Sequence, residues 1–241
     1  MEKSRAPYGL EIIQSCLSCP VREDSLFCHL GPDALARLNG IRQASVHPKG
    51  ALLFVEGQPA HGLFVLCSGK AKLTASSAQG RSLIVRVADA GEVLGLSAVM
   101  SNAAYEVGAE TLEPSQVSFL PRDEFLRFLQ DYGEVSVQVA RHLSMELQRA
   151  YHQLTRIVLA PTARAKLAGL LVERASPDGQ QELKGVSFQL PLTHGEIGEL
   201  IGCSRETVSR LLNDFRREGF IQVKGSSITL LDPAKLKAFL T

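Results

Sequence analysis

The sequence lacks any apolar run that approaches the roughly 18 residues needed for a membrane-spanning helix. Its N-terminal stretch, MEKSRAPYGLEII, also lacks the apolar core of a secretory signal peptide. We therefore expect a cytoplasmic protein that has no membrane partner and lies in a reducing compartment. In such a compartment, clustered cysteines are more often ligands or redox-active thiols than structural disulfides.

The sequence is also short of net charge and of catalytic motifs. Its 26 Lys and Arg nearly balance its 25 Asp and Glu, so its formal net charge is only +1. A nucleic-acid-binding function would therefore depend on the local placement of Arg and Lys. GxSxG, HExxH, P-loop and dinucleotide-binding motifs are missing, and the six histidines are scattered. These absences predict that the protein is not an enzyme.

The sequence does contain a region with the pattern of β-structure. Between residues 47 and 121, short apolar runs alternate with glycine-containing turns at a spacing of about 8–12 residues. This spacing is typical of an all-β sandwich or barrel. A short helix that carries Leu35, Leu38 and Ile41 is expected before it.

A helical region follows from residue 122 to residue 157, with no proline and with Gly133 as its only glycine. Its apolar residues recur every three or four positions and form one stripe: Val135, Val139, Leu143, Leu147, Ala150, Leu154 and Ile157. A surface helix packed on its own sheet would show such a stripe, and so would a dimer seam that resembles a coiled coil. The length of the region and its lack of breaks favour the seam. Pro161 then ends the helix.

Residues 192–220, LTHGEIGELIGCSRETVSRLLNDFRREGF, have the pattern of two short helices joined by a glycine-containing turn. Thr193 and Glu196 have the spacing of a capping box at the start of the first helix. Ser204 can cap the second helix, and Gly219 can end it. The pattern predicts a helix-turn-helix.

The second of these helices has two chemically different faces at about 100° per residue. One face is apolar: Val208, Leu211, Leu212 and Phe215. The opposite face is polar: Glu206, Ser209, Arg210, Asn213 and Arg217. Arg can donate two hydrogen bonds to guanine, Glu can accept from cytosine, and Ser can do either. A solvated surface helix would also show a polar face, but the caps and the hairpin that follows favour DNA recognition.

That hairpin is FIQVKGSSITLL, residues 220–231, in which two β-branched runs flank a glycine-containing turn. It would form the wing of a winged helix-turn-helix. Lys224 at its tip could contact a phosphate, which positions a protein on DNA without reading the sequence.

Several stretches resemble the CRP/FNR family of bacterial transcription regulators. GCSRETVSRLL is similar to the family's recognition-helix segment almost residue for residue, and EGQPAHGLFVLCSGKAKL and GEVLGLSAVM resemble its β-roll. The resemblance covers roughly residues 30 to 240 and implies an α+β fold. It implies four parts: a cysteine-bearing N-terminal segment (1–30), a jelly-roll-like β-roll sensor domain (31–121), a long dimerisation helix (122–160) and a C-terminal winged helix-turn-helix DNA-binding domain (161–241).

The resemblance also implies DNA contacts and partners. In the family, the Arg, Glu and Arg of an RETxxR segment contact operator bases, and FNR-like members use the Glu, Ser and Arg of ExxSR. Both patterns are present here on four residues: Arg205, Glu206, Ser209 and Arg210. Such regulators bind pseudo-palindromic double-stranded DNA as homodimers and contact RNA polymerase.

Cyclic AMP is not an expected ligand. Family members that bind it carry a Glu and then an Arg-Ser pair that holds the cyclic phosphate. Here Leu96 stands in place of the Glu, and Ala103, Ala104 and Tyr105 stand where the pair would be. An anionic phosphate needs an Arg or a nest of backbone N–H groups, so this departure argues against cyclic-nucleotide binding.

Three of the five cysteines lie in CLSCPVREDSLFC: Cys16, Cys19 and Cys28. Thiolates are soft ligands that suit iron–sulfur clusters or zinc. FNR-like members hold an oxygen-sensitive [4Fe–4S] cluster with N-terminal cysteines and one further cysteine on a strand just before the dimer helix. That strand has no cysteine here. A fourth ligand could be Cys67 or His29, or an exogenous group. The alternative for Cys67 is a small residue of the buried core, where cysteine is common.

We therefore expect a homodimeric, sequence-specific transcription regulator that senses redox state or oxygen through its N-terminal cysteines rather than through cyclic AMP. A labile [4Fe–4S] cluster, a zinc site, redox-switching thiols and the absence of a sensing role all remain open for these cysteines. The alternative is a regulator whose β-roll binds another small-molecule effector, with the cysteines holding zinc or having no sensing role.

Overall fold

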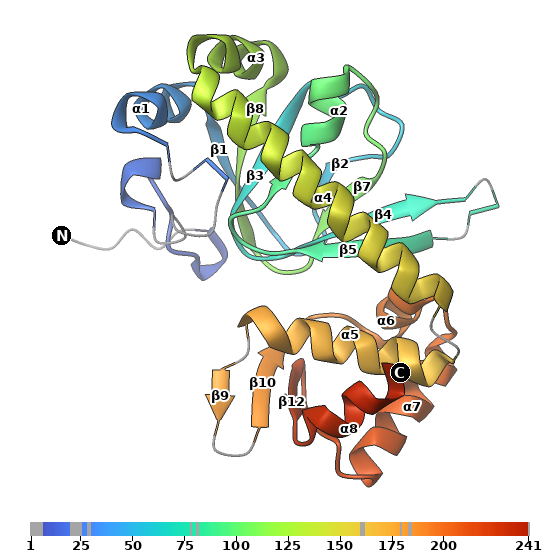
Figure 1. Cartoon of the computed structure of the whole chain (residues 1–241). Coiled ribbons are helices and arrows are strands. Elements are labelled where there is room, and N and C mark those ends of the chain that lie inside the picture. The colour runs from blue at the N-terminus through green and yellow to red at the C-terminus, as the bar shows by residue number, and fades with distance from the viewer. Residues whose placement is uncertain are drawn as a thin grey trace. The chain divides into compact units, whose positions relative to one another are not determined.

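A computed structural model of the chain describes residues 7–19, 26–27, 30–77, 79–80, 82–159, 162–178, 180–182 and 185–240 (Figure 1). The chain divides into two compact units, residues 1–147 and 148–241, and the division falls within one long helix. Each unit is described by itself. No helix in the described ranges is long and apolar enough to cross a membrane.

The N-terminal unit contains two four-stranded antiparallel sheets, with strand orders β1-β8-β3-β6 and β2-β7-β4-β5. The strands are β1 (Gln43–His47), β2 (Leu52–Phe54), β3 (Gly62–Ser68), β4 (Ala71–Ser76), β5 (Ser82–Ala88), β6 (Val93–Leu94), β7 (Gly108–Thr111) and β8 (Ser115–Pro121). Side chains from both sheets share one hydrophobic core, for example Leu63 of β3 and Leu73 of β4. This is the expected β-roll.

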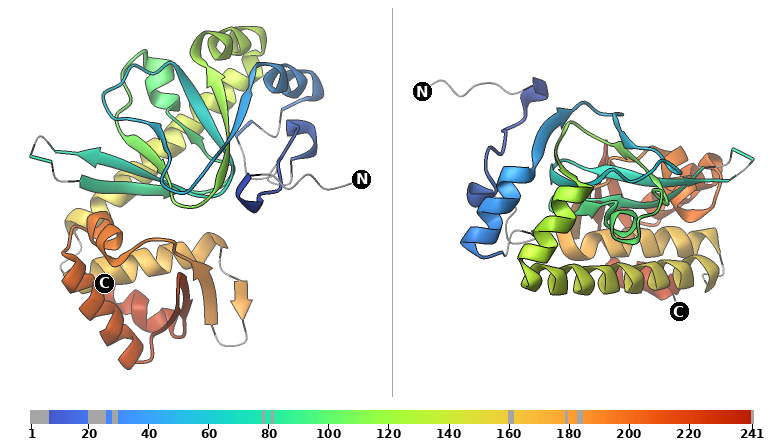
Figure 2. Two further views of the ribbon diagram at one scale, coloured as in Figure 1. Left: turned by 180° about the vertical axis from the view of Figure 1, so that it is seen from behind. Right: turned by 90° about the horizontal axis from the view of Figure 1, so that it is seen from above.

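Helices cover the ends of the roll. They are α1 (Pro32–Ile41), α2 (Leu96–Ser101), α3 (Arg122–Asp131) and the start of α4 (Gly133–Leu159). α1 and α3 lie side by side, as the views of Figure 2 also show. Before α1, two short 3-10 turns lie in the N-terminal segment, at Pro7–Gly9 and Cys16–Ser18. One buried side chain each from the N-terminal segment, α1 and α3 belongs to the roll's core: Phe27, Leu35 and Phe125.

The helical region predicted as one helix is two helices, because the chain leaves the helical conformation at Tyr132 (φ −127°, ψ 79°). Tyr132 donates its backbone N–H to the carbonyl of Phe128 and packs its ring against that of Phe128 (5.1 Å between centroids). Phe125 and Phe128 are completely buried, so α3 is fixed to the roll. α4 then starts in a new direction at Gly133.

The apolar stripe predicted along this region is not one continuous surface. Val135 and Val139 are buried in the core of the roll, and Leu143 packs against that core. Leu147 and Leu154, in contrast, are 55% and 59% exposed. The first half of the predicted stripe therefore packs on the chain's own roll, whereas Leu147 and Leu154 in its second half are exposed, and the dimer seam stays a prediction. The side chain of Ile157 lies outside the described residues.

The C-terminal unit combines helices with a small antiparallel sheet of order β11-β12-β10-β9. Its elements are α5 (Ala163–Asp178), β9 (Gln180–Glu182), β10 (Gly185–Gln189), α6 (His194–Ile201), α7 (Arg205–Arg217), β11 (Ile221–Lys224), β12 (Ser227–Leu230) and α8 (Pro233–Lys237). α5 packs against α6, α7, α8 and β10. α6, α7 and the β11–β12 hairpin form the predicted helix-turn-helix and its wing. The predicted α+β fold is confirmed.

Local sequence explains the helix-turn-helix. Thr193 and Glu196 make the capping box, in which each side chain accepts a hydrogen bond from the other residue's backbone N–H. Gly202 ends α6 in the left-handed conformation (φ 70°), which glycine adopts without strain. A Cβ on Gly198 would lie 2.5 Å from the carbonyl oxygen of Cys203, so only glycine lets the turn pack this closely. Ser204 then caps α7 by accepting from Thr207 N–H (3.2 Å).

Candidate functional site

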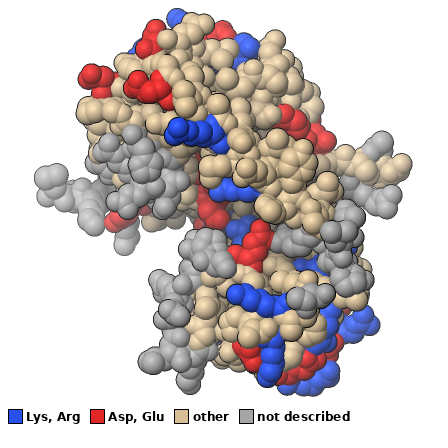
Figure 3. All heavy atoms as spheres, in the orientation of Figure 1, with Lys and Arg blue, Asp and Glu red and all other residues tan. Residues whose placement is uncertain are grey.

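The first candidate site is the polar face of α7. Its apolar face is buried, since Val208, Leu211, Leu212 and Phe215 are each at most 7% exposed. Glu206 and Arg210 are exposed on the opposite side, where Ser209 is half-buried. Arg205 is exposed at the start of the helix. Figure 3 shows basic side chains mixed with acidic ones at the lower end of this unit, where Figure 1 places α7. The structure thus brings together the four residues of α7 that the sequence singled out.

The charges on this face follow from its position at the start of a helix. The backbone N–H of Glu206 and the hydroxyl of Ser204 lower the pKa of the Glu206 carboxyl, so it is ionised at neutral pH. The basic residues at the end of α7 are engaged locally, because Arg217 pairs with Asp214 (2.7 Å). Among the described residues, Arg210 forms no ion pair. Lys224 is exposed at the end of β11, beside the hairpin turn.

Sequence reasoning missed one residue at this face. His194, the first residue of α6, places its Nδ1 2.7 Å from the hydroxyl oxygen of Ser209 on α7. The two residues are 15 positions apart, so the contact depends on how α6 and α7 cross. A histidine directly after the helix-capping Thr193 was the only signal in the sequence.

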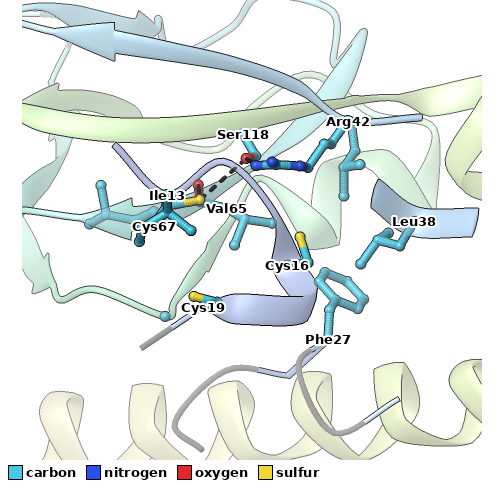
Figure 4. A pocket seen from close by; sticks show the side chains of 12 residues that line it. Ile13, Cys16, Cys19, Phe27, Leu38, Arg42, Val65, Cys67 and Ser118 are labelled. Atoms are coloured by element: carbon cyan, nitrogen blue, oxygen red, sulfur yellow. Dashed lines mark hydrogen bonds between the residues drawn. The ribbon is translucent and has the colours of Figure 1, made fainter. Parts of the chain in front are cut away.

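The second candidate site is a small pocket in the N-terminal unit (Figure 4). Cys16 and Cys19 of the N-terminal segment line it together with Cys67 of β3. The rest of its wall is mostly apolar, with Phe27 as its largest side chain, and Arg42 lies at its edge. Cys28, the third predicted N-terminal ligand, and His29 lie outside the described residues. Cys203 is in the turn before α7 and takes no part in the pocket.

Cys67 is both a buried residue and a member of this pocket. It is 7% exposed, and its Sγ lies 3.2 Å from the hydroxyl oxygen of Ser118 on the neighbouring strand β8. Burial raises the pKa of the Cys67 thiol to about 11, although the contact with Ser118 lowers it. Burial also raises the pKa of Cys16. These two sulfurs are therefore protonated thiols at neutral pH in the metal-free protein.

The pocket fits a thiophilic metal in its chemistry but not in its present dimensions. Thiols are the correct donors for zinc or an iron–sulfur cluster, and they would lose their protons on binding. The cavity volume is only about 30 Å³, which is room for one or two water molecules. The described ranges, from which Cys28 is missing, contain no group of three or more His, Cys, Asp or Glu arranged to hold a metal ion. A cluster would require Cys28 and an outward shift of the N-terminal segment.

Tyr105 and Leu96, at two of the positions that hold cyclic AMP in other family members, are packed into the interior of the roll. Tyr105 is 5% exposed, its ring stacks on Phe54 (4.2 Å between centroids) and its hydroxyl donates to the carbonyl of Gly62 (2.5 Å). Leu96 is buried as well. Ala103 and Ala104 instead line a hollow of about 540 Å³ on the surface. None of these positions directs a cation into the roll.

The third candidate site is an exposed apolar stripe on α4. Its members lie alternately three and four residues apart: Val137, Ala140, Ser144, Leu147, Tyr151 and Leu154. The four large side chains among them are 53–62% exposed. This spacing corresponds to the a and d positions of a heptad. The exposed stripe is therefore rotated from the predicted one and shares only Leu147 and Leu154 with it.

Comparison with known proteins agrees with this architecture. Residues 45–132 match the model of a cyclic nucleotide-binding domain, and residues 165–239 match that of a Crp-like helix-turn-helix domain. The chain is 28% identical over 211 residues to a CRP-like cAMP-activated global transcriptional regulator of Mycobacterium tuberculosis, covering 88% of this chain and 94% of that protein. It is 27% identical to the fumarate and nitrate reduction regulatory protein of Vibrio cholerae, covering 92% of this chain and 88% of that protein.

Among solved structures, FixK2 from Bradyrhizobium japonicum has the same fold, with a TM-score of 0.73 at 20% identity over 83% of this chain and 98% of that one. The two matched domains, in this order and with regulators among the relatives, support DNA binding and provide no sign of an enzyme family. The chain belongs to the CRP/FNR family of transcription regulators.

Proposed function

We propose that this protein acts as a homodimeric, sequence-specific regulator of transcription whose N-terminal cysteines sense redox state or oxygen. The observation that carries the DNA-binding part is α7, whose apolar face is buried while its polar face is exposed. A helix fixed in this way can enter the major groove without any change in the fold of its own domain.

The exposed groups of α7 match the chemistry of base edges. Arg205 and Arg210 can each donate two hydrogen bonds to guanine, and the ionised Glu206 can accept one from the cytosine amino group. Ser209 can donate or accept. Lys224 would contact a phosphate and fix the register of the domain on the duplex.

The exposed stripe on α4 supports a homodimer. Large apolar side chains at a and d positions pair two helices when a second copy covers them. A two-fold dimer would read a pseudo-palindromic operator with half-site centres one helical turn apart, roughly 34–36 Å. By analogy with the family, RNA polymerase is the further partner.

A charge introduced into the stripe tests the dimer. Leu147→Glu should raise the dimer dissociation constant at least about 100-fold, because it buries a carboxylate at the centre of the seam. Met145→Glu is the matched control, since Met145 is 51% exposed on α4 but lies outside the stripe. Sedimentation of both variants decides the point. If both variants remain dimeric, the stripe is not the interface.

The thiol pocket supports the sensing part. We infer that Cys16, Cys19 and Cys28, with Cys67 as fourth ligand, hold a labile [4Fe–4S] cluster, which would supply oxygen-sensitive redox chemistry. The chain's own contribution is to hold the N-terminal segment against the roll. Attachment and release of this segment would bias α4 between DNA-competent and incompetent arrangements, as in other two-state switches.

A second candidate function is favoured by the hollow beside Ala103 and Ala104. It has about 540 Å³ of space and is also lined by His61, Asn102 and Arg122. These groups could bind a small polar effector, and the cysteines would then hold zinc or have no sensing role. Cyclic AMP is not the proposed effector.

Two measurements on protein purified without oxygen separate these functions. Selection from random DNA should return a palindromic sequence, and iron and sulfide analysis should find a cluster that air destroys. Zinc in place of iron would favour the second candidate. Failure to enrich any sequence would contradict the DNA-binding proposal.

A further inference from the structure

The N-terminal segment is held on the roll by side chains far away in the sequence. Gln116, in β8, is 1% exposed, and its side-chain amide is bound on both sides by one residue of the segment. Its Oε1 accepts from the backbone N–H of Ile13 (2.7 Å), and its Nε2 donates to the carbonyl of Ile13 (2.8 Å). A buried carboxamide thus pairs with the segment as a neighbouring β-strand would.

Two residues at the end of α1 bind the next part of the segment. Asn39 accepts from the backbone N–H of Cys16 (3.1 Å), and Arg42 donates to the carbonyl of Gln14. Arg42 also donates to the side-chain oxygen of Asn39 (3.0 Å), so these two side chains fix each other.

Arg42 links the segment to the interior thiol. Its second terminal nitrogen donates to the hydroxyl of Ser118 (3.2 Å), which in turn contacts Cys67 (3.2 Å) (Figure 4). One continuous chain of polar contacts therefore runs from the backbone of Gln14 to the sulfur of Cys67. None of the contacts with the segment's backbone involves a cysteine side chain.

We propose that Asn39, Arg42 and Gln116 are positioning residues that bind the backbone of residues 13–16 and hold Cys16 and Cys19 at Cys67 before any metal or cluster is present. This inference deepens the proposed sensing function and rests on it for its physiological meaning. These three residues, the anchor, bind the backbone of the segment. Its attachment therefore does not depend on the chemistry of the thiols. The sulfurs of Cys16, Cys19 and Cys67 would then lie close together before a cofactor or oxidant arrives, and the segment would move outward only when a cluster enters.

Amide hydrogen exchange of the metal-free, reduced, full-length protein tests the anchor directly. The amides of Ile13 and Cys16 should be protected in the native chain. Gln116→Leu or Arg42→Ala should speed their exchange about tenfold or more, which corresponds to one or two lost hydrogen bonds. Arg37→Ala is the matched control, because Arg37 lies on the same helix and pairs with Glu124 instead of the segment. It should leave the protection unchanged.

One further variant, an internal reference and a second readout keep the test decisive. Gln116→Glu preserves volume but places a second acceptor against the carbonyl of Ile13, so it should also loosen the segment if Gln116→Leu does not fold. Exchange in the β4–β5 pair serves as internal reference, since a general loss of structure would affect that pair as well. Alkylation of Cys67 by iodoacetamide, measured against Cys203 in the same molecule, should accelerate with the anchor variants only.

The cysteine variant Cys16→Ser/Cys19→Ser separates this inference from the proposed function. It should keep the protection of Ile13, because the anchor binds backbone. If native Ile13 and Cys16 exchange as fast as in a free peptide, or if this variant loses the protection, the inference is wrong. Neither result depends on DNA binding or on a cluster, so a failure of the proposed function would leave this test intact.

Discussion

α7 and the N-terminal cysteine segment are held in place by different kinds of contact. α7 buries four apolar side chains and is capped by Ser204, so it cannot leave its domain without exposing that domain's core. Residues 13–16 of the N-terminal segment are attached through backbone hydrogen bonds to Asn39, Arg42 and Gln116. Farther along the segment, Phe27 is buried in the core of the roll. Net hydrogen bonds contribute only about 0.5–1.5 kcal/mol each, because water replaces them. The helix proposed to read DNA is therefore firmly fixed in its domain, whereas residues 13–16 can detach at a smaller cost.

The strongest test of this contrast removes the central side chain of α7. Phe215 is fully buried and packs against Phe220 and Phe239. Phe215→Ala should destabilise the C-terminal unit by about 3–5 kcal/mol, through lost burial and the cavity it leaves. Denaturant unfolding should show the change in that unit, while hydrogen exchange at Ile13 stays as it is. A parallel loss of protection at Ile13 would mean that the two regions are not independently held.

A smaller effect is expected when a side chain of α7 that is proposed to contact bases is removed, because the core stays intact. Arg210→Ala should cost about 1–3 kcal/mol at its own base position and relax specificity there. Lys224→Ala should weaken binding to all sequences alike. The ratio of the affinities for the selected operator and for random DNA measures the specificity. If Arg210→Ala leaves that ratio unchanged, α7 does not read bases with this face.

The pH dependence of the free energy of unfolding tests how Cys67 is buried in the N-terminal unit. Burial raises the folded-state pKa of Cys67 to about 11, above the ordinary thiol value of 9.0, so its protonated thiol stabilises the fold below about pH 9. This contribution is lost as pH rises from about 9 to 11, and it should be smaller by about 1 kcal/mol at pH 10 than at pH 8. The free energy of unfolding of the metal-free N-terminal unit should fall more steeply in the native chain than in Cys67→Ala. Equal slopes would show that Cys67 is not buried as a thiol.

The smallest expected effect concerns His194. Its hydrogen bond fixes the hydroxyl of Ser209, so His194→Ala should change discrimination only at the base that Ser209 reads, by about 0.5–1.5 kcal/mol. Binding to a set of operators with single base changes would measure this. A uniform loss across the set would indicate that His194 contacts a phosphate instead.

Contacts between neighbours in sequence explain what could be predicted. The caps, the buried face and the exposed groups of α7 all lie within 16 residues, so periodicity and capping rules were sufficient for them. The all-β character of residues 47–121 followed from the spacing of turns, and the β-roll from the resemblance to the family. The close contact between Gly198 and the carbonyl oxygen of Cys203 is also local in sequence, although no sequence rule identified it.

Contacts between distant parts of the chain explain what was missed. Cys67 meets Ser118 because β3 pairs with β8, and Gln116 meets Ile13 across 103 positions. The one available signal was a run of polar residues, Ser115, Gln116 and Ser118, in a strand that proved to be buried. The exposed stripe of α4 was misplaced because the first turns of that helix pack on the roll, which rotates the free face away from Val135 and Val139.

In the proposed function, the state of the N-terminal segment controls DNA binding through α7. The decisive measurement is operator affinity without oxygen and again after exposure to air, for the native chain and for Cys16→Ser/Cys19→Ser/Cys28→Ser. We expect air to change the affinity of the native chain by about 5–150-fold, the usual range of coupling between sites, and to leave the triple variant unaffected. Equal responses of the two proteins, or no response of the native chain, would contradict it.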